Sequence, residues 1–394
     1  YSHHMEEQAR NVVLIGGGHA HVRVMKDIAL ERAKNATLDQ YRYILICNYP
    51  YAYYSGMLPG CVATLYTEDD ISMDLPALSK WTGFYFVHAT AYKIDPKEQL
   101  VYARSESGDD LEPIPYHLLS LDVGSVTNTC NIPGVMEHAL TTRPISEILT
   151  KIKDFELSHP ADQWKRDPKV VIVGGGAAGV ELCFGFKHRF NKVYPGIKTE
   201  FTVIDSNQKN ILKRYSDWVA STASKNLKKL DVNVILGARV QSIDENKICL
   251  DDGKELEYDM VAWATGAQAP AFLKDTGLDL DDGGYIKVSK TLQTLSYKNI
   301  FACGDCCSIE DCDYVEKAGV YAVRAGPFAA KNIINVLTNK PPAIFTPQTG
   351  FLSLLMTGDG RAIGSWKGFC LANSYVWKLK DKIDRDFMDL YDVV

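Results

Sequence analysis

Residues 170–179 read Val-Val-Ile-Val-Gly-Gly-Gly-Ala-Ala-Gly, a short apolar run followed directly by a GxGxxG turn. The apolar run alone would suit a strand or part of a helix, and the glycines decide between them. The first glycine permits the tight bend, the second lets backbone N–H groups approach a pyrophosphate, and the third lets helix and strand pack closely. Residues 180–182 (Val-Glu-Leu) then open a helical pattern whose N-terminus would face the phosphates. The stretch therefore predicts a dinucleotide site.

A second apolar run, residues 201–204, ends at Asp205. A carboxylate there can accept hydrogen bonds from the adenosine ribose, which favours NADH over NADPH. The interval between the turn and this acid exceeds the roughly 20 residues of the simplest such unit, and an insertion around residues 191–199 would account for the difference. The expected NAD site comprises Gly174, Gly176, Ala177, Ala178, Gly179, Glu181, Asp205 and Gly266.

The composition is that of a soluble globular protein. The chain has 394 residues, 46% of them hydrophobic and 23% charged, which is enough for two or three domains. The 43 basic and 49 acidic residues give a net charge of −6 without a long basic run, so nucleic-acid binding is not expected. No uncharged apolar run reaches the about 18 residues of a transmembrane helix. The first five residues lack the apolar run of a signal peptide and are left out of the fold prediction.

The ten cysteines are scattered rather than arranged as a secreted disulfide framework. This favours a reducing compartment, either the cytoplasm or an organellar matrix. Residues 303–312 hold the one cluster, which contains a CxxC formed by Cys303 and Cys306. A zinc site would need a second pair at suitable spacing, so no metal is predicted and packing in a tight loop is the simpler interpretation.

A second glycine-rich turn lies near the N-terminus. Residues 11–15 form an apolar run that leads into residues 16–21 (GGGHAH) and then a helical pattern. His21 stands where the third glycine would be, so its bulk must displace the helix slightly or face the ligand. The next predicted strand, residues 43–47, ends at Asn48 instead of an acid. An asparagine can still hydrogen-bond a ribose, which leaves a weaker dinucleotide signature.

Two further segments could face a ligand. Residues 50–60 form a loop by their prolines and glycines, and their aromatic and small residues suit a flat ring, although a packed surface loop would look the same. A predicted strand over residues 298–305 ends at Asp305, which could hydrogen-bond a ribityl chain or hold phosphate through neighbouring N–H groups. The helix predicted over residues 317–336 would present its positive dipole end nearby.

An internal repeat connects the two turns. Residues 83–125 and residues 232–266 each contain a strand, a hairpin and a final strand that ends in a glycine, and each follows its glycine-rich turn at a similar distance. The chain therefore contains two copies of one dinucleotide-binding module. The predicted fold class is α/β, with two Rossmann-like domains and a small C-terminal segment.

The expected domains are a first cofactor domain over residues 9–145, an inserted NAD(H) domain over residues 146–272, a return to the first domain over residues 273–345, and a C-terminal segment over residues 346–394. In that segment, apolar residues recur at helical spacing over residues 374–391, with four basic residues balanced by four acids. A helix drawn to anionic lipid would have a basic polar face, so a docking helix or dimer contact is favoured over a membrane anchor.

These motifs together resemble the two-dinucleotide-binding-domain flavoproteins, the pyridine nucleotide-disulfide oxidoreductase superfamily. More narrowly, residues 16–22 (GGGHAHV), 54–60 (YSGMLPG), 317–324 (KAGVYAVR) and 380–388 (KDKIDRDFM) resemble the type II NADH dehydrogenase-like flavoprotein that occurs alone or fused ahead of selenide, water dikinase. The resemblance extends over nearly the whole chain, from Asn11 to Tyr391.

The resemblance implies FAD in the first module and NADH in the second, with electrons leaving to an acceptor for which a quinone is favoured. Lys317 would lie near the pyrimidine edge of the flavin, and Glu181 would act either as a proton relay or in helix packing. The implied FAD site comprises Gly16, Gly18, His19, Ala20, His21, Asn48, Ser55, Gly56, Met57, Leu58, Pro59, Ala89, Gly124, Ser125, Gly304, Asp305, Lys317, Ala318 and Gly319.

Two alternatives to this function stay open. The redox-active CxxxxC of the disulfide reductases is missing, since only Cys61 lies near the first loop, so a dithiol relay is disfavoured. Cys130, the cysteines of residues 303–312 and Cys370 lie in regions loosely comparable to those that carry thiols in sulfide:quinone reductases, which allows sulfide or selenide oxidation. The other alternative is a redox sensor that binds FAD and NADH but turns over slowly.

Overall fold

Five parallel strands form the centre of each of two sheets in the computed structural model, which describes residues 10–393. The first five residues therefore lie outside the described part. The first sheet runs β20 (Ile300–Ala302), β8 (Leu118–Leu121), β1 (Asn11–Ile15), β2 (Arg42–Cys47) and β5 (Tyr85–Asp95), then continues antiparallel into β6 (Leu100–Ser105) and β7 (Ile114–Pro115). The second runs β10 (Leu140–Thr141), β17 (Met260–Trp263), β11 (Lys169–Val173), β12 (Glu200–Asp205) and β13 (Val232–Leu236).

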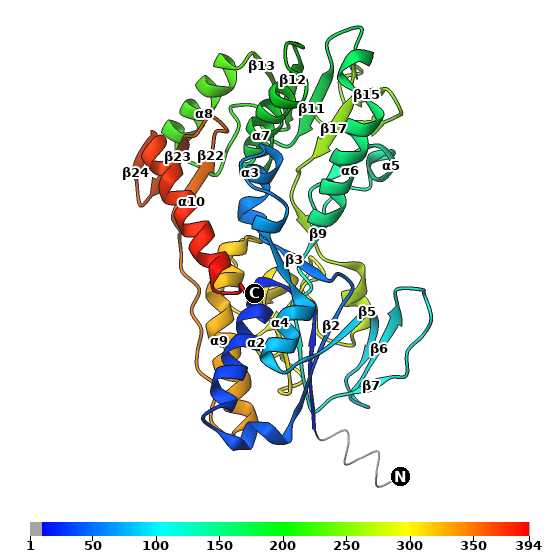
Figure 1. Cartoon of the computed structure of the whole chain (residues 1–394), viewed down its shortest axis with the longest axis vertical. Helices are drawn as coiled ribbons and strands as arrows, with labels where there is room; N and C mark the ends of the chain where they lie inside the picture. The colour runs from blue at the N-terminus through cyan, green and yellow to red at the C-terminus, as the bar shows by residue number, and fades with distance from the viewer. Residues whose placement is uncertain (1–9, 394) are drawn as a thin grey trace.

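The two sheets match strand by strand, so the predicted duplication and the α/β fold class are confirmed. Their central strands β1 and β11 are continuous apolar runs whose residues are almost all buried. Strands covered on both faces have this composition, because neither face meets water. Figure 1 places the first sheet in the lower lobe of the molecule and the second in the upper lobe.

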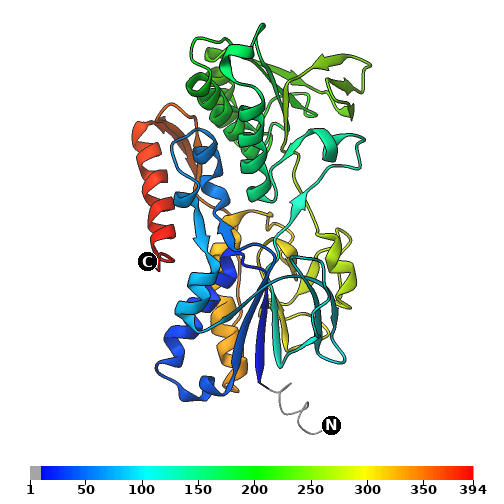
Figure 2. The same cartoon turned by 45° about the vertical axis from the view of Figure 1, so that its right-hand side comes forward.

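Helices cover both sheets. In the lower lobe, α2 (His19–Arg32) and α9 (Gly319–Leu337) lie side by side (Figures 1 and 2), and Gly326 allows a close approach, since a Cβ there would lie 3.0 Å from the Cβ of Arg23. In the upper lobe the helices are α6 (Ile145–Ser158), α7 (Ala177–Val193) and α8 (Asp217–Lys229). Helix α9, which was predicted to begin at residue 317, begins at Gly319 with Ala318 as its N-cap.

The prediction of a loop over residues 50–60 needs correction. Residues 50–60 are more than a loop, because they contain β3 (Tyr51–Tyr53) and α3 (Leu58–Val62), and α3 packs against α7 of the other lobe. The domain boundary after residue 145 stays a prediction, and β10, which precedes it, pairs with β17 in the second sheet. An antiparallel pair of β9 (Val126–Thr127) and β18 (Ala267–Gln268) connects the lobes.

The C-terminal segment contains a sheet that the sequence did not suggest. β22 (Ser353–Met356), β23 (Ala362–Trp366) and β24 (Phe369–Asn373) pair antiparallel, and the expected helix follows as α10 (Ser374–Asp389). The side chain of Asn373 caps α10 by accepting from the N–H groups of Tyr375 and Val376. In Figure 1 this red helix runs from the upper lobe to the lower one. Within residues 10–393, no helix is both long and apolar enough to cross a membrane.

The remaining α-helices and β-strands are short. They are β4 (Ser72–Asp74), α4 (Leu75–Thr82), α5 (Val135–His138), β14 (Val240–Ile243), β15 (Lys247–Leu250), β16 (Glu255–Glu257), β19 (Ile286–Val288) and β21 (Cys307–Ile309).

Candidate functional site

The first glycine-rich turn has the backbone geometry that a dinucleotide needs. Gly16 has a positive φ of 92°, and a Cβ there would lie 2.2 Å from the carbonyl oxygen of Asp122, so only glycine fits. Gly18 is the N-cap of α2 and has no side chain to cap this helix, while the N–H of His21 donates to the Asp122 carboxylate at 3.1 Å. Gly124 lies three residues after β8, and a Cβ built on it would have no atom of the described residues within 4 Å. These residues fit the pyrophosphate arm of FAD.

His21 does neither of the two things expected of it. Its ring is fully buried, with Nδ1 2.7 Å from the carbonyl oxygen of Gly16 and Nε2 2.8 Å from Oγ of Ser120. The ring therefore packs between the turn and β8 and does not face a ligand, and α2 still begins at His19. Burial lowers the pKa of His21 to about 4, so the imidazole is neutral. Any role of His21 in binding FAD rests with its backbone.

His19 lies at the contact between the turn and the C-terminal helix. Its ring packs edge-on against Tyr54 and Phe387, with centroid distances of 5.3 and 5.7 Å. Burial lowers the pKa of His19 to about 4. Among residues 10–393, no group hydrogen-bonds its buried Nδ1 atom.

A group of charged and polar side chains lies at the predicted flavin end. Arg143 forms an ion pair with Asp305 at 3.2 Å and also bonds the hydroxyl of Ser125. Lys317 donates to the carbonyl oxygen of Cys307 and lies over the ring of Tyr285. The predicted residues Ser125, Asp305 and Lys317 are thus brought together. Arg143 was not predicted, because it lies in the connection between the two repeats and not in a motif.

The other residues assigned to FAD have less uniform positions. Asn48 is exposed at the end of β2, and its carbonyl oxygen accepts from His88 at 3.0 Å. The side chains of Met57 and Leu58 belong to the apolar core that α3 shares with α7, and Ala89 belongs to the core of the first sheet. Pro59 is also buried in α3. Contacts of these four buried residues with FAD stay predictions.

The second glycine-rich turn is open where a nucleotide would lie. Gly174 has a φ of 112°, and a Cβ at Gly179 would lie 1.8 Å from the carbonyl oxygen of Gly174. At Gly176 and Gly266, by contrast, a Cβ would have no atom of the described residues within 4 Å. Asp205 is the last residue of β12, and its carboxylate lies beside Gly175. The geometry fits an adenine dinucleotide whose ribose is held by the acid.

Glu181 points from α7 toward the C-terminal segment. One of its carboxylate oxygens accepts from the N–H of Met356 at 3.0 Å. Burial raises the pKa of Glu181 to about 7, a rise that the nearby Lys380 opposes and the Asp384 charge adds to. This carboxyl can therefore hold or release a proton near neutral pH.

Lys380 and Asp384 form a buried ion pair on α10, with 7% and 5% of their surfaces exposed and a distance of 2.7 Å. Lys380 also donates to the carbonyl oxygen of Gly56 at 2.9 Å, and Tyr54 donates to Asp384 at 3.1 Å. The pair therefore fixes the loop that carries the predicted FAD residues Ser55 and Gly56. It was missed in the sequence, where both residues were counted as part of a charged surface.

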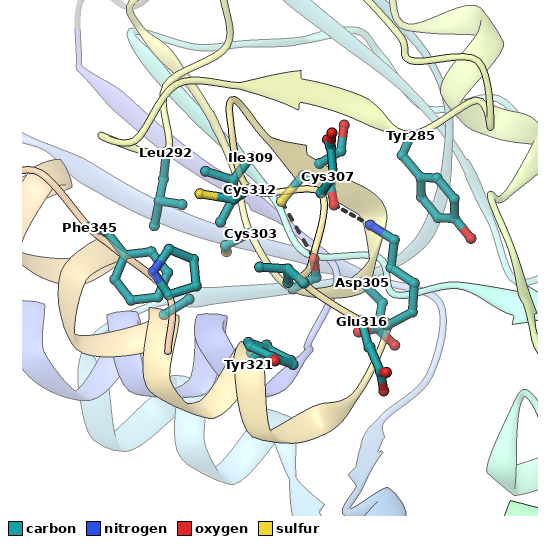
Figure 3. A pocket seen from close by; sticks show the side chains of 18 of the residues that line it. Tyr285, Leu292, Cys303, Asp305, Cys307, Ile309, Cys312, Glu316, Tyr321 and Phe345 are labelled. Carbon is teal, nitrogen blue, oxygen red and sulfur yellow. Dashed lines mark hydrogen bonds between the residues drawn. The ribbon is translucent and has the colours of Figure 1, made fainter. Parts of the chain in front are cut away.

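The cysteines are not assembled into one reactive site. Cys303 and Cys307 line a cavity of about 260 Å³ beside Asp305 (Figure 3), and burial raises the pKa of both thiols. Cys130 lies on an exposed turn, whereas Cys370 lies on β24. Neutral buried thiols are poor nucleophiles, which weakens a cysteine relay. In the described residues 10–393, no three His, Cys, Asp or Glu side chains are grouped to hold a metal.

Comparison with known proteins agrees with this geometry. Residues 10–326 match the family described as pyridine nucleotide-disulphide oxidoreductase. The chain belongs to this family. Its members are flavoproteins that bind FAD, so the expectation of an FAD-dependent oxidoreductase is confirmed.

Two curated relatives of this family member are quinone reductases by name. The internal alternative NAD(P)H-ubiquinone oxidoreductase A1 of Arabidopsis thaliana is 29% identical over 84% of this chain and 68% of its own length. An external alternative NAD(P)H-ubiquinone oxidoreductase B1 of Solanum tuberosum is 27% identical over 77% of this chain and 56% of its own length. The chain thus spans between about half and two thirds of these relatives.

Solved structures share the fold of the whole chain. NDH2 of Plasmodium falciparum has a TM-score of 0.81 at 16% identity, covering 97% of both chains. The sulfide:quinone oxidoreductase of Aquifex aeolicus has a TM-score of 0.76 at 18% identity, covering 97% of this chain and 91% of that one. Because the sequence identities are only 16% and 18%, these similarities show the fold and do not identify the substrate.

Proposed function

We propose that this flavoprotein transfers hydride from NADH to FAD and passes the electrons to a quinone. The observation that carries the proposal is the presence of two matched nucleotide turns in one chain, with open space at Gly124 in the first and at Gly176 and Gly266 in the second. FAD, when bound, supplies the redox chemistry. The residues of the chain hold the two nucleotides, orient them and exclude water.

The quinone as acceptor rests on the relatives, which are named NAD(P)H-ubiquinone oxidoreductases. The preference for NADH rests on Asp205, because a carboxylate that accepts from the ribose hydroxyls would repel the 2′-phosphate of NADPH. The relatives are also named mitochondrial, which supports an organellar location over the cytoplasm as part of the same proposal.

An anaerobic titration of the FAD-loaded protein tests the proposal. We expect about one equivalent of NADH to bleach the flavin absorbance band, and NADPH to do so only at higher concentration. A soluble quinone should then restore the band within the turnover time. Slow restoration would favour the redox sensor, and restoration only by other oxidants would remove the quinone.

The sulfide alternative has its own outcome in the same experiment. A flavin that stays oxidised with NADH but bleaches with sulfide would overturn the proposed donor. In that case, serine at Cys130, Cys306 and Cys370 separates a cysteine relay from direct attack of sulfide on the flavin.

Glu181 is the proposed proton donor for quinone reduction, which consumes two protons. Its pKa of about 7 predicts that the acid form, and with it the rate, is lost as the pH rises through neutrality. We expect Glu181→Gln to lower steady-state quinone reduction by about 10- to 100-fold and to remove this inflection, while NADH still bleaches the flavin. The exposed Glu200→Gln serves as control. An unchanged pH profile in Glu181→Gln would assign Glu181 to helix packing only.

The outer face of the C-terminal segment is a candidate contact surface. Tyr375, Leu379 and Ile383 follow one another at helical spacing on α10 and are 74%, 46% and 42% exposed, and Phe369 on β24 is 80% exposed. Apolar surface of this kind commonly marks a contact with another protein or a membrane. We propose that it holds the enzyme against a quinone-containing membrane or a second copy. Flotation with lipid vesicles and sedimentation without them distinguish the two.

A further inference from the structure

Asp122 places a carboxyl group in front of Gly18 of the FAD turn, a position that is open in the NAD turn. The backbone carbonyl of Asp122 lies 2.2 Å from a Cβ built on Gly16, and that of Ala264 lies 2.2 Å from a Cβ built on Gly174, so the two residues are equivalent in the two modules. The space in front of Gly176 in the second module is open. In front of Gly18, its counterpart in the first module, stands the Asp122 carboxylate.

The carboxyl group of Asp122 is held on the first turn of α2. It is buried, with 3% of the residue exposed, and one of its oxygens accepts from the N–H of His21 at 3.1 Å. A Cβ at Gly18 or Gly304 would lie 2.3 or 2.4 Å from its oxygens, so both glycines leave room for it. An anion bound at this helix N-terminus would therefore meet a carboxyl group as well as backbone N–H groups.

Burial outweighs the N–H groups of His21 and Ala20, which bond the Asp122 carboxylate and favour its charged form, and no cationic side chain of the described residues adds to them. His21 on α2 is a neutral imidazole. Cys303, Cys306 and Cys307, which follow β20, and Cys47 at the end of β2 are thiols whose pKa values are raised by burial, and Asp305 adds a second carboxyl group. The nearest cation to that second carboxyl, Arg143, is paired with Asp305 itself.

We propose that Asp122 is protonated when FAD is bound and presents its hydroxyl group to the pyrophosphate as a hydrogen-bond donor. Binding of FAD above neutral pH is then accompanied by uptake of one proton from solvent. The inference rests on the proposed FAD site of the first module and is independent of the electron donor and acceptor. Burial already raises the pKa of Asp122 to about 7 without the added charge of a pyrophosphate.

The sign of the pH dependence follows from this linkage. Below about pH 7 the apoprotein already carries the proton, and FAD binds without proton uptake. Above that pH the proton must be taken up, so the Kd for FAD should rise by up to about tenfold per pH unit. Asparagine has the shape of the protonated acid and donates through its amide, so Asp122→Asn should bind FAD tightly at every pH.

The test is a titration of the full chain, stripped of FAD, with FAD between about pH 6 and about pH 9. We expect a Kd that rises above neutrality in the wild type and in the surface control Asp110→Asn, and a flat Kd in Asp122→Asn. A flat wild-type curve, or equal slopes in wild type and Asp122→Asn, overturns the proposal. If the wild type did not bind FAD at any pH, the first module would be refuted as the FAD site.

A second measurement does not depend on the folding of a variant. Calorimetry of FAD binding to the wild type near pH 8, in two buffers with different ionisation enthalpies, counts the protons taken up. We expect about 0.5 to 1 proton per FAD. Zero uptake would overturn the proposal.

Discussion

Alanine in place of Gly179 should abolish reduction by NADH while FAD stays bound. The added Cβ would lie 1.8 Å from the carbonyl oxygen of Gly174. The new Cβ is fixed to the backbone of α7 and the oxygen belongs to the backbone of the turn, so the clash can be relieved only by moving the start of α7 away from β11. That movement displaces the N–H groups that are proposed to hold the pyrophosphate of NADH. We expect the Kd of NADH to rise at least about 100-fold, which corresponds to about 2.7 kcal/mol.

The measurement is flavin bleaching as a function of NADH concentration, with bound FAD counted by its absorbance. Gly350→Ala is the matched control, because Gly350 is exposed, has no atom within 4 Å of the new Cβ and does not have a positive φ. Unchanged NADH affinity in a folded Gly179→Ala protein would contradict the assignment of this turn to NADH.

The first module shows how the same position tolerates a large residue. His21 occupies the place of Gly179, but its ring reaches the carbonyl oxygen of Gly16 and the hydroxyl of Ser120. The sequence predicted the strand, the turn and the helix here, because glycines and apolar runs act over a few residues. It could not predict the orientation of the ring, which depends on Ser120 in a strand about one hundred residues away.

Asp122 could have been found from the sequence. The internal repeat aligns it with Ala264, so an acid stands where the second module has a small apolar residue. Only the structure shows that its carboxylate turns inward onto the first turn of α2. Arg143 had no such signal, because it lies outside both repeats and reaches Asp305 through the fold alone.

The C-terminal segment was the least predictable part. Its helix follows from apolar periodicity, but the expected apolar face is divided: Val376 is buried, whereas Leu379 and Ile383 are exposed. The three strands before it are short, although the glycines of residues 357–360 and 367–368, which separate them, are turn signals. Lys380 and Asp384 look like ordinary surface charges, since a balanced charge pattern does not tell which side of a helix meets the protein.

Replacing Lys380 with methionine should be strongly destabilising. Asp384 and Glu181 would then be buried without the cation that both now face. Breaking a buried pair by removing one partner commonly costs about 3–5 kcal/mol. Lys382→Met is the matched control, because Lys382 forms the same i,i+4 pair with Asp386 on the exposed side of α10. An exposed pair contributes at most about 1 kcal/mol, so this control should unfold almost as the wild type does.

The pH dependence distinguishes a lost charge partner from simple loss of packing. Burial raises the pKa values of Glu181 and Asp384 above their unfolded values, and removal of the Lys380 charge raises them further. A carboxyl group whose pKa is raised in the folded state stabilises the protein below its unfolded pKa. This contribution is lost as the pH rises through the folded pKa. The deficit of Lys380→Met should therefore be larger at about pH 8 than at about pH 5, in thermal unfolding of the FAD-loaded protein. A deficit that is equal at both pH values would mean that the lysine stabilises through its aliphatic chain and its bond to Gly56, and that the buried carboxyl groups do not depend on its charge.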